Sequence, residues 1–165
     1  MGNKKPKKSE MNFKFWFILA LSFIASLLIG WRVLLPVFLP ETDGEGLVKV
    51  RVGEAQVLVE IADETDEIAQ GLSGRASLPA NQGMLFVLPS RSQPAYWMKE
   101  MNFDLDMIWI DNGRVVEIGE NIPAPVGGEE PVTYQPQVAV TDVLEVNAGW
   151  ARSNGVSVGD MVVLE

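Results

Sequence analysis

The chain has 165 residues, about the length of one domain, and its charge is divided unevenly along it. Residues 1–40 hold six basic residues and one acidic residue, whereas residues 41–165 hold seven basic and 21 acidic residues, a formal net charge of −14. Phosphate backbones repel a domain this acidic, so we expect no nucleic-acid partner. The absence of cysteine and histidine excludes disulfides, thiol or histidine-based nucleophilic catalysis and ordinary zinc sites.

An uncharged apolar run follows a basic amino-terminal tail. The run reads FWFILALSFIASLLIGW, and it gains the VLLPVFL that follows if Arg32 snorkels toward the interface. About 20 such residues in a helix span a bilayer core. The sequence therefore predicts a basic cytoplasmic tail over 1–14, a single transmembrane anchor over 15–39 and a polar linker, PETDGEG, over 40–46.

The lysines of the tail favour a cytoplasmic amino terminus, because positive flanks stay inside. The domain after the linker is then expected to be extracytoplasmic, in a single-pass protein of the cell membrane. A cleaved signal peptide is an alternative, although its apolar core is usually only about 7–15 residues long and no clear small-x-small cleavage site precedes the acidic stretch. A third interpretation is a buried helix of the domain itself.

Short strands separated by turn signals dominate residues 47–165. Valines alternate with charged residues over 48–52, and a second alternating run over 57–61 follows the turn Gly53-Glu54, which predicts a β-hairpin. Asn112-Gly113 predicts another hairpin turn. Further short strands are predicted at 84–88, 96–99, 107–110, 115–118, 143–146 and 162–164. Residues 119–137 carry four prolines and are expected to form a long loop or arm.

Two short helices complete the expected domain. Four acidic residues over 63–67 favour a helix start, Ile68 and Leu72 give that helix one apolar face, and Gly71 or Gly74 would end it. One or two helical turns are also predicted over 148–154. The expected fold class is mainly β, a compact sandwich or barrel with one or two short helices, preceded by a single transmembrane helix. Too few helices separate the strands for a parallel α/β fold.

Alternation along two strands yields the candidate site residues. It places Trp97 and Lys99 on one face of their strand, and Asp106 on an apolar face with Ile108 and Ile110. A carboxylate on an apolar face needs a partner, and Lys99 or Arg75 is the expected one. These residues predict a polar cluster at the mouth of an aromatic pocket over 83–110, or else an ion pair that fixes strand register. The candidate ligand-binding residues are Arg75, Trp97, Lys99 and Asp106.

Two further kinds of chemistry have weaker support. The methionines of the same segment suit copper(I), but without histidine or cysteine three of them would have to converge, and methionine more often fills cores. We therefore expect no metal and no cofactor. A carboxylate pair for glycoside chemistry is also available, since an acidic domain always offers such pairs. The carboxylates that supply it are Asp104, Asp106, Glu145 and Asp160.

Eight short motifs, spread over about residues 47–165, follow one another in a fixed order. They are Gly71-Leu72-x-Gly74-Arg75, Leu78, Gly83-Met84-Leu85-Phe86, Trp97-Met98-Lys99, Leu105-Asp106-x-Ile108-Trp109-Ile110-Asp111, Glu120-Asn121-x-Pro123, Leu144-Glu145-Val146-x-Ala148-Gly149 and Gly159-Asp160. In this order they resemble the DUF192 family of unknown function. The resemblance implies a compact β domain with small helices, commonly behind a signal peptide or membrane anchor, and it carries over no catalytic residue. Ser73, Glu100 and Asp104 depart from the family pattern, which often has Met, Asn and Pro there.

The sequence as a whole favours a membrane-anchored, extracytoplasmic binding or accessory module. Its expected partners are the membrane, through the amino-terminal helix, and a small molecule, an envelope polymer or another protein. A cofactor-independent hydrolase or lyase that acts on envelope carbohydrate is one alternative. A domain with a purely structural role in interactions is the other.

Overall fold

A computed structural model describes residues 46–127 and 132–165. The predicted tail, the predicted anchor and nearly all of the predicted linker lie outside these residues. None of the helices in the two described ranges combines the length and apolar character that a membrane crossing requires.

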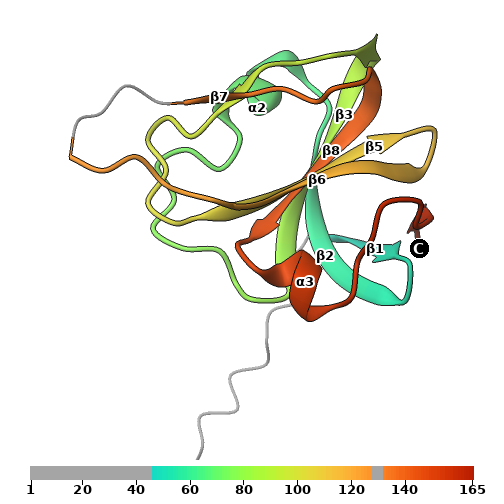
Figure 1. Ribbon diagram of the computed structural model, residues 1–165. Coiled ribbons are helices and arrows are strands. Elements are labelled where there is room, and N and C mark those ends of the chain that lie inside the picture. The colour runs from blue at the N-terminus through green and yellow to red at the C-terminus, as the bar shows by residue number, and fades with distance from the viewer. Residues whose placement is uncertain (1–45, 128–131) are drawn as a thin grey trace, which may run out of the picture. The chain divides into compact units, whose positions relative to one another are not determined.

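Seven strands form one sheet, in the order β6-β5-β8-β3-β2-β1-β9 (Figure 1). Their bounds are β1 Val48–Val52, β2 Ala55–Ala62, β3 Gln82–Ser92, β5 Leu105–Asp111, β6 Arg114–Ile122, β8 Val140–Asn147 and β9 Val162–Leu164. Neighbours run antiparallel except β2 and β3, which are parallel and are connected through helix α2, Thr65–Gln70. A separate two-stranded ribbon pairs β4, Tyr96–Trp97, with β7, Thr133–Tyr134.

The sheet is a curled half-barrel whose two edges approach each other at one end. Met161, just before β9, forms a bridge with Arg114 at the start of β6. The Val162 N–H also donates to the Gly113 carbonyl at 2.9 Å. The predicted mainly β fold with two short helices is thus confirmed, and it is nearer to the predicted barrel than to the predicted sandwich because seven strands share one sheet.

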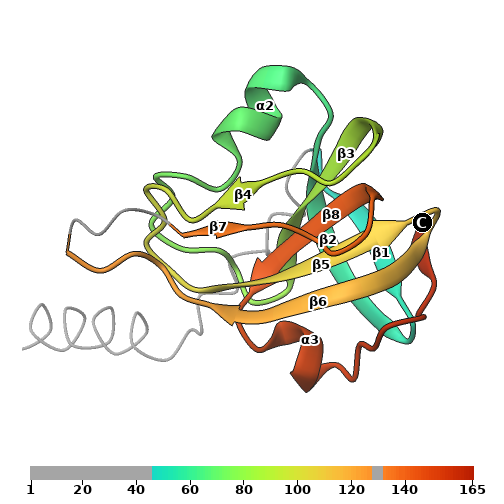
Figure 2. The ribbon, with the colours of Figure 1, turned by 45° about the horizontal axis from the view of Figure 1, so that its top comes forward.

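Each face of the sheet buries its own apolar core. On the inner face, alternate residues of the strands pack with Trp150 and Ala151 of helix α3, Trp150–Ser153. On the outer face, Met84, Phe86 and Met107 pack under the loops that carry α2 and the β4–β7 ribbon. Figure 2 shows this layering, with α3 on one side of the sheet and the ribbon and α2 on the other. Because both faces are buried, a polar side chain on a central strand has no route to bulk solvent except through a cavity.

The local predictions hold where they rest on local chemistry. Helix α2 begins at a capping box formed by Glu64 and Glu67, and it ends at Gly71, whose φ of +49° suits glycine. The Asn112-Gly113 turn has positive φ at both residues, as a hairpin turn of this type requires.

The predicted loop over 119–137 is wrong at two places. β6 continues to Ile122, which pairs with Leu105 beyond a bulge, so the strand reaches the residue before Pro123. Thr133 and Tyr134 form β7 on the ribbon. Prolines end or flank both segments without interrupting them, which explains why proline content overstated the length of the loop.

A close approach of β3 to β8 positions the residues of the candidate site. A Cβ atom built on Gly83 would lie 2.6 Å from the Glu145 carbonyl oxygen. Only glycine permits that separation. Gly83 therefore sets how tightly β3 packs beside the strand that carries Glu145.

Candidate functional site

Asp106 is fully buried on the inner face of the sheet, and its partners are backbone amides. One carboxylate oxygen accepts from the N–H groups of Asn121 at 2.8 Å and Gly149 at 3.0 Å, and the other accepts from Ala151 at 2.9 Å. The prediction that Lys99 or Arg75 pairs with Asp106 is wrong. Two of these N–H groups lie at the start of α3, where they have no partner within the helix, and the three together stabilise the carboxylate by hydrogen bonds without a cation.

Arg75 pairs with Glu60 on β2. Its two terminal nitrogens reach both carboxylate oxygens, one of them at 2.7 Å, and this pairing lowers the pKa of Glu60. Asn102 donates to the Arg75 carbonyl at 2.8 Å, which ties the loop after α2 to the loop after β4. Arg75 therefore stabilises the loop after α2 through its contacts with Glu60 and Asn102, and it does not contact Asp106.

Trp97 on β4 and Lys99 in the turn after it are both exposed, on the same side as alternation predicted, whereas Met98 between them is buried. The Trp97 side chain is 57% exposed. The Lys99 ammonium stands 5.7 Å from the centre of the Trp97 ring and 3.8 Å from a Glu100 carboxylate oxygen. The structure thus brings Trp97 and Lys99 together, and it separates both from Asp106.

A cavity of about 280 Å³ opens between α2 and β4, and we call it the α2–β4 cavity. Residues 68–73 of α2 and its exit loop form one wall, and residues 94–97 form the opposite wall. Phe86, Met101 and Glu145 contribute to the lining. Most of the lining is apolar, as in typical small-molecule sites.

Glu145 is the acidic side chain of this cavity. It is only 5% exposed, on β8, with Met84 of β3 and Met107 of β5 as its paired neighbours. Burial raises the pKa of its carboxyl to about 8, and no hydrogen bond from a described residue offsets that effect. The carboxyl is therefore mostly protonated at neutral pH.

Tyr96 lines the same cavity and carries a second buried polar group. Its hydroxyl has no hydrogen-bond partner among the described residues. Burial and then the nearby Glu145 charge raise the pKa of the phenol. The ring packs edge-to-face with Phe86 at 5.2 Å and with Trp109 at 5.5 Å between ring centres, which fixes its orientation.

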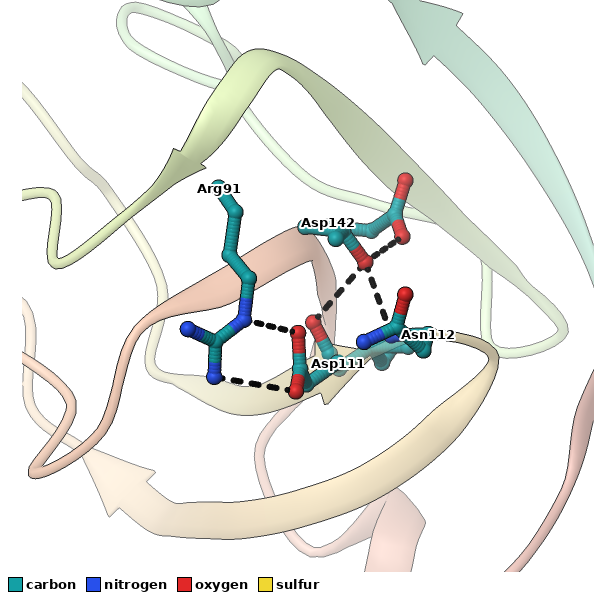
Figure 3. Close-up of polar contacts among 6 residues, drawn as sticks. Arg91, Asp111, Asn112 and Asp142 are labelled. Atoms are coloured by element: carbon teal, nitrogen blue, oxygen red, sulfur yellow. Dashed lines mark hydrogen bonds and ion pairs between the residues drawn. The ribbon is translucent and has the colours of Figure 1, made fainter.

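A second polar cluster lies at the end of the β5–β6 hairpin (Figure 3). Arg91 reaches both carboxylate oxygens of Asp111, at 2.8 and 3.2 Å, and lowers the pKa of that carboxyl. Thr141 donates to Asp142 at 2.6 Å and accepts from the Asn112 N–H at 3.1 Å. These contacts tie the ends of three strands together, and the cationic side chain of the cluster, Arg91, is paired with Asp111.

The carboxylates proposed for glycoside chemistry do not form a pair in the cavity. Asp104 accepts from the Ala124 N–H, and Asp160 accepts from the Ser157 N–H, both at 2.8 Å. Glu145 is the one of the four candidates that lines the α2–β4 cavity. The residues in 46–127 and 132–165 also form no cluster of three or more acidic side chains suited to a metal ion.

Tyr96 was not predicted as a site residue, and Glu145 was predicted only as one of four carboxylates for glycoside chemistry. The sequence does contain one indication of the role of Glu145. In the strand segment VLEVN its neighbours Val143, Leu144 and Val146 are apolar, and they lie on both faces of the strand. Such a strand is buried on both sides, so its glutamate has to face a core or a cavity.

The folded domain matches a known family model. Residues 48–164 match DUF192, which is described as an uncharacterised ACR. The chain belongs to the DUF192 family. The resemblance seen in the eight sequence motifs is thereby confirmed.

Two solved structures are similar to this DUF192 chain. One is a crystal structure of a protein from Sinorhizobium meliloti, described as a suggested transcription regulator, with 30% identity and a TM-score of 0.65 over 72% of this chain and 93% of that one. The other is a protein of unknown function from Novosphingobium aromaticivorans, with 29% identity and a TM-score of 0.62 over 71% of this chain and 84% of that one. No curated protein matches the chain.

Proposed function

We propose that this DUF192 protein is a membrane-anchored, extracytoplasmic binding module that takes a small, mainly apolar ligand in the α2–β4 cavity. One observation carries the proposal. Glu145 and Tyr96 bring a carboxyl and a hydroxyl into an apolar cavity, where neither has a hydrogen-bond partner among the described residues. An unpartnered buried polar group costs about 1–3 kcal/mol, so a ligand that supplies partners recovers that free energy.

The candidate residues from the sequence take different parts in this proposal. Trp97 lines the cavity and is exposed, so we propose that it contacts the ligand, with Lys99 over its ring. Arg75 holds the loops that carry the cavity walls. Asp106 lies on the other face of the sheet, where it supports the α3 junction.

Binding is favoured over the enzymatic alternative. A carboxylate-pair hydrolase needs two carboxyl groups about 5–9.5 Å apart in one cleft. In the α2–β4 cavity Glu145 has no second carboxylate among the lining residues. The description of the Sinorhizobium meliloti relative points to gene regulation, but the charge of −14 over residues 41–165 of this chain disfavours contact with DNA.

The membrane anchor and the location rest on residues 1–40 of the sequence. An apolar segment over 15–39, long enough to span a bilayer when Arg32 snorkels, follows a lysine-rich tail, which supports an amino terminus in the cytoplasm. Protease added to intact spheroplasts is expected to digest the domain, while the membrane fraction retains the amino-terminal segment. A domain protected from protease until the cells are lysed would contradict this orientation.

A tryptophan placed at the cavity mouth is expected to block ligand binding. Ala69 is exposed on α2 and lines the cavity, so the indole of Ala69→Trp would occupy the entrance. The measurement is a thermal-shift screen of a small-molecule library on the full-length chain. A ligand at one hundred times its dissociation constant stabilises the protein by about 2.7 kcal/mol.

Ala76→Trp is the matched control, because Ala76 is an exposed alanine outside the α2–β4 cavity. Hits that stabilise the wild type and Ala76→Trp but not Ala69→Trp support the proposal. A library that yields only hits indifferent to Ala69→Trp would place binding elsewhere and overturn it.

A further inference from the structure

The walls of the α2–β4 cavity combine aromatic rings with one acid. Phe86, Tyr96 and Trp97 contribute rings, and Glu145, a residue only 5% exposed, lines the same cavity. Aromatic faces attract cations, and they do so most strongly where water is excluded. A buried carboxylate beside such rings therefore provides both elements that stabilise an organic ammonium group.

No basic side chain among the described residues lines this cavity. Arg75, the nearest in sequence to the α2 wall, is held by Glu60. Lys99 is exposed beside Glu100 and stands over the Trp97 ring, so a cation already occupies one aromatic face at the cavity mouth. The domain as a whole is strongly acidic, and such a field concentrates cations and repels anions.

We propose that the α2–β4 cavity binds a small organic cation, an amine carried on an apolar or aromatic body, with the Glu145 carboxylate as its counter-ion. This inference rests on the proposed function, because it names the ligand class for the same cavity. The apolar body contacts Phe86 and the α2 wall. We expect the Tyr96 hydroxyl, which has no partner among the described residues, to move within hydrogen-bond distance of the ionised carboxylate and to donate to it.

Binding of an amine changes the protonation of the site. Before an amine binds, Glu145 holds its proton at pH 7, and Tyr96 is the other titratable group of the lining. When an ammonium group enters, the carboxyl proton leaves to the buffer and an ion pair remains. Charge balances, because one positive ligand enters and one proton departs.

A neutral or anionic ligand fits these walls less well. An alcohol would pair with the protonated carboxyl, but it would gain nothing from the acidic surroundings or from a charge on the rings. A carboxylate ligand would enter a cavity that has no cation among its lining residues. An amine, an alcohol and a carboxylate of almost the same shape are therefore expected to bind the cavity with different affinities, because they differ in charge.

Isothermal titration calorimetry with 2-phenylethylamine, 2-phenylethanol and phenylacetate tests the proposal. The full-length chain is placed in lipid nanodiscs, because detergent tails would compete for an apolar cavity, and empty nanodiscs serve as the blank. The amine is expected to bind most tightly. At pH 7 its binding is also expected to release close to one proton, so the observed heat differs between phosphate and Tris buffers by the difference in their ionisation enthalpies.

Glu145→Gln keeps the shape of the side chain and removes its charge. This variant is expected to weaken amine binding by about 30-fold or more, to abolish proton release and to leave the affinity for the alcohol nearly unchanged. The proton release needs no variant, so it decides the question even if Glu145→Gln does not fold.

Three results would overturn the inference. They are an alcohol or carboxylate that binds as tightly as the amine, amine binding without proton release, and unchanged amine affinity in Glu145→Gln. If these occur while Ala69→Trp still blocks another ligand, the binding function stands and only the cation class is wrong. If no ligand depends on Ala69, both proposals fail.

Discussion

Replacing Glu145 with glutamine is expected to abolish most of the loss of stability that the wild-type domain undergoes as the pH rises from about 4.5 to about 8. In the unfolded chain the carboxyl releases its proton near pH 4.5, whereas in the folded domain burial holds the proton until about pH 8. Between these values the unfolded state binds fewer protons, so the free energy of unfolding falls as the pH rises. One unit of pKa difference corresponds to about 1.4 kcal/mol, which makes the fall several kcal/mol.

The measurement is the free energy of unfolding of the full-length chain in urea, at a series of pH values from 4.5 to 8.5. Glu145→Gln is expected to equal the wild type at the acidic end and to be more stable by a few kcal/mol at the basic end. Glu54→Gln is the matched control, since Glu54 is exposed in the β1–β2 turn. Identical pH profiles for wild type and Glu145→Gln would contradict the burial of an unpaired carboxyl.

Other carboxyls of the domain act in a different pH range. The pKa values of Glu60, Asp111 and Glu165 are lowered by their arginine partners, so their stabilising contributions are present at neutral pH and are lost as the pH falls toward and below their ordinary range. Each of these three carboxyls is at least partly exposed, so its ion pair contributes little to the free energy of unfolding. The decline toward pH 8 therefore belongs to Glu145.

Features with a local cause were predictable from the sequence. The Asn112-Gly113 turn needs two residues that tolerate positive φ, and the start of α2 needs acidic residues at its first turn, so neighbouring residues were sufficient to locate both. Alternation also placed Ile108 and Ile110 on one face and Met107 on the other, as the two cores confirm.

The candidate site depended on contacts that sequence patterns do not reveal. Asp106 was paired with cationic side chains because charges are visible in a sequence, whereas backbone N–H groups more than 40 residues away are not. The cavity forms only when the loop after α2, the β4 ribbon and β8 assemble on one face of the sheet. Glu145 and Tyr96 become a site through that assembly and not through any motif that contains both.

Asp106→Ala is expected to destabilise the domain by about 3–5 kcal/mol, the cost of leaving strongly polar groups buried and unpaired. Three backbone N–H groups, on Asn121, Gly149 and Ala151, would lose their acceptor in a site closed to water. Asp106→Asn keeps the shape of the side chain and one acceptor oxygen, but its NH2 group would face a backbone N–H donor. We therefore expect the free energy of unfolding to fall by about 1–3 kcal/mol.

The measurement is the free energy of unfolding in urea of these variants and of Asp104→Ala. It compares a buried carboxylate that accepts backbone N–H groups with an exposed one. Asp104 also accepts a backbone N–H, that of Ala124, but in an exposed position where water replaces it, so a loss of about 1 kcal/mol or less is expected. Equal losses for Asp104→Ala and Asp106→Ala would refute the account of Asp106. Because Asp106 shares the inner face with Ile108 while Glu145 faces the cavity, Asp106→Asn, where folded, is expected to bind the cavity ligand with wild-type affinity.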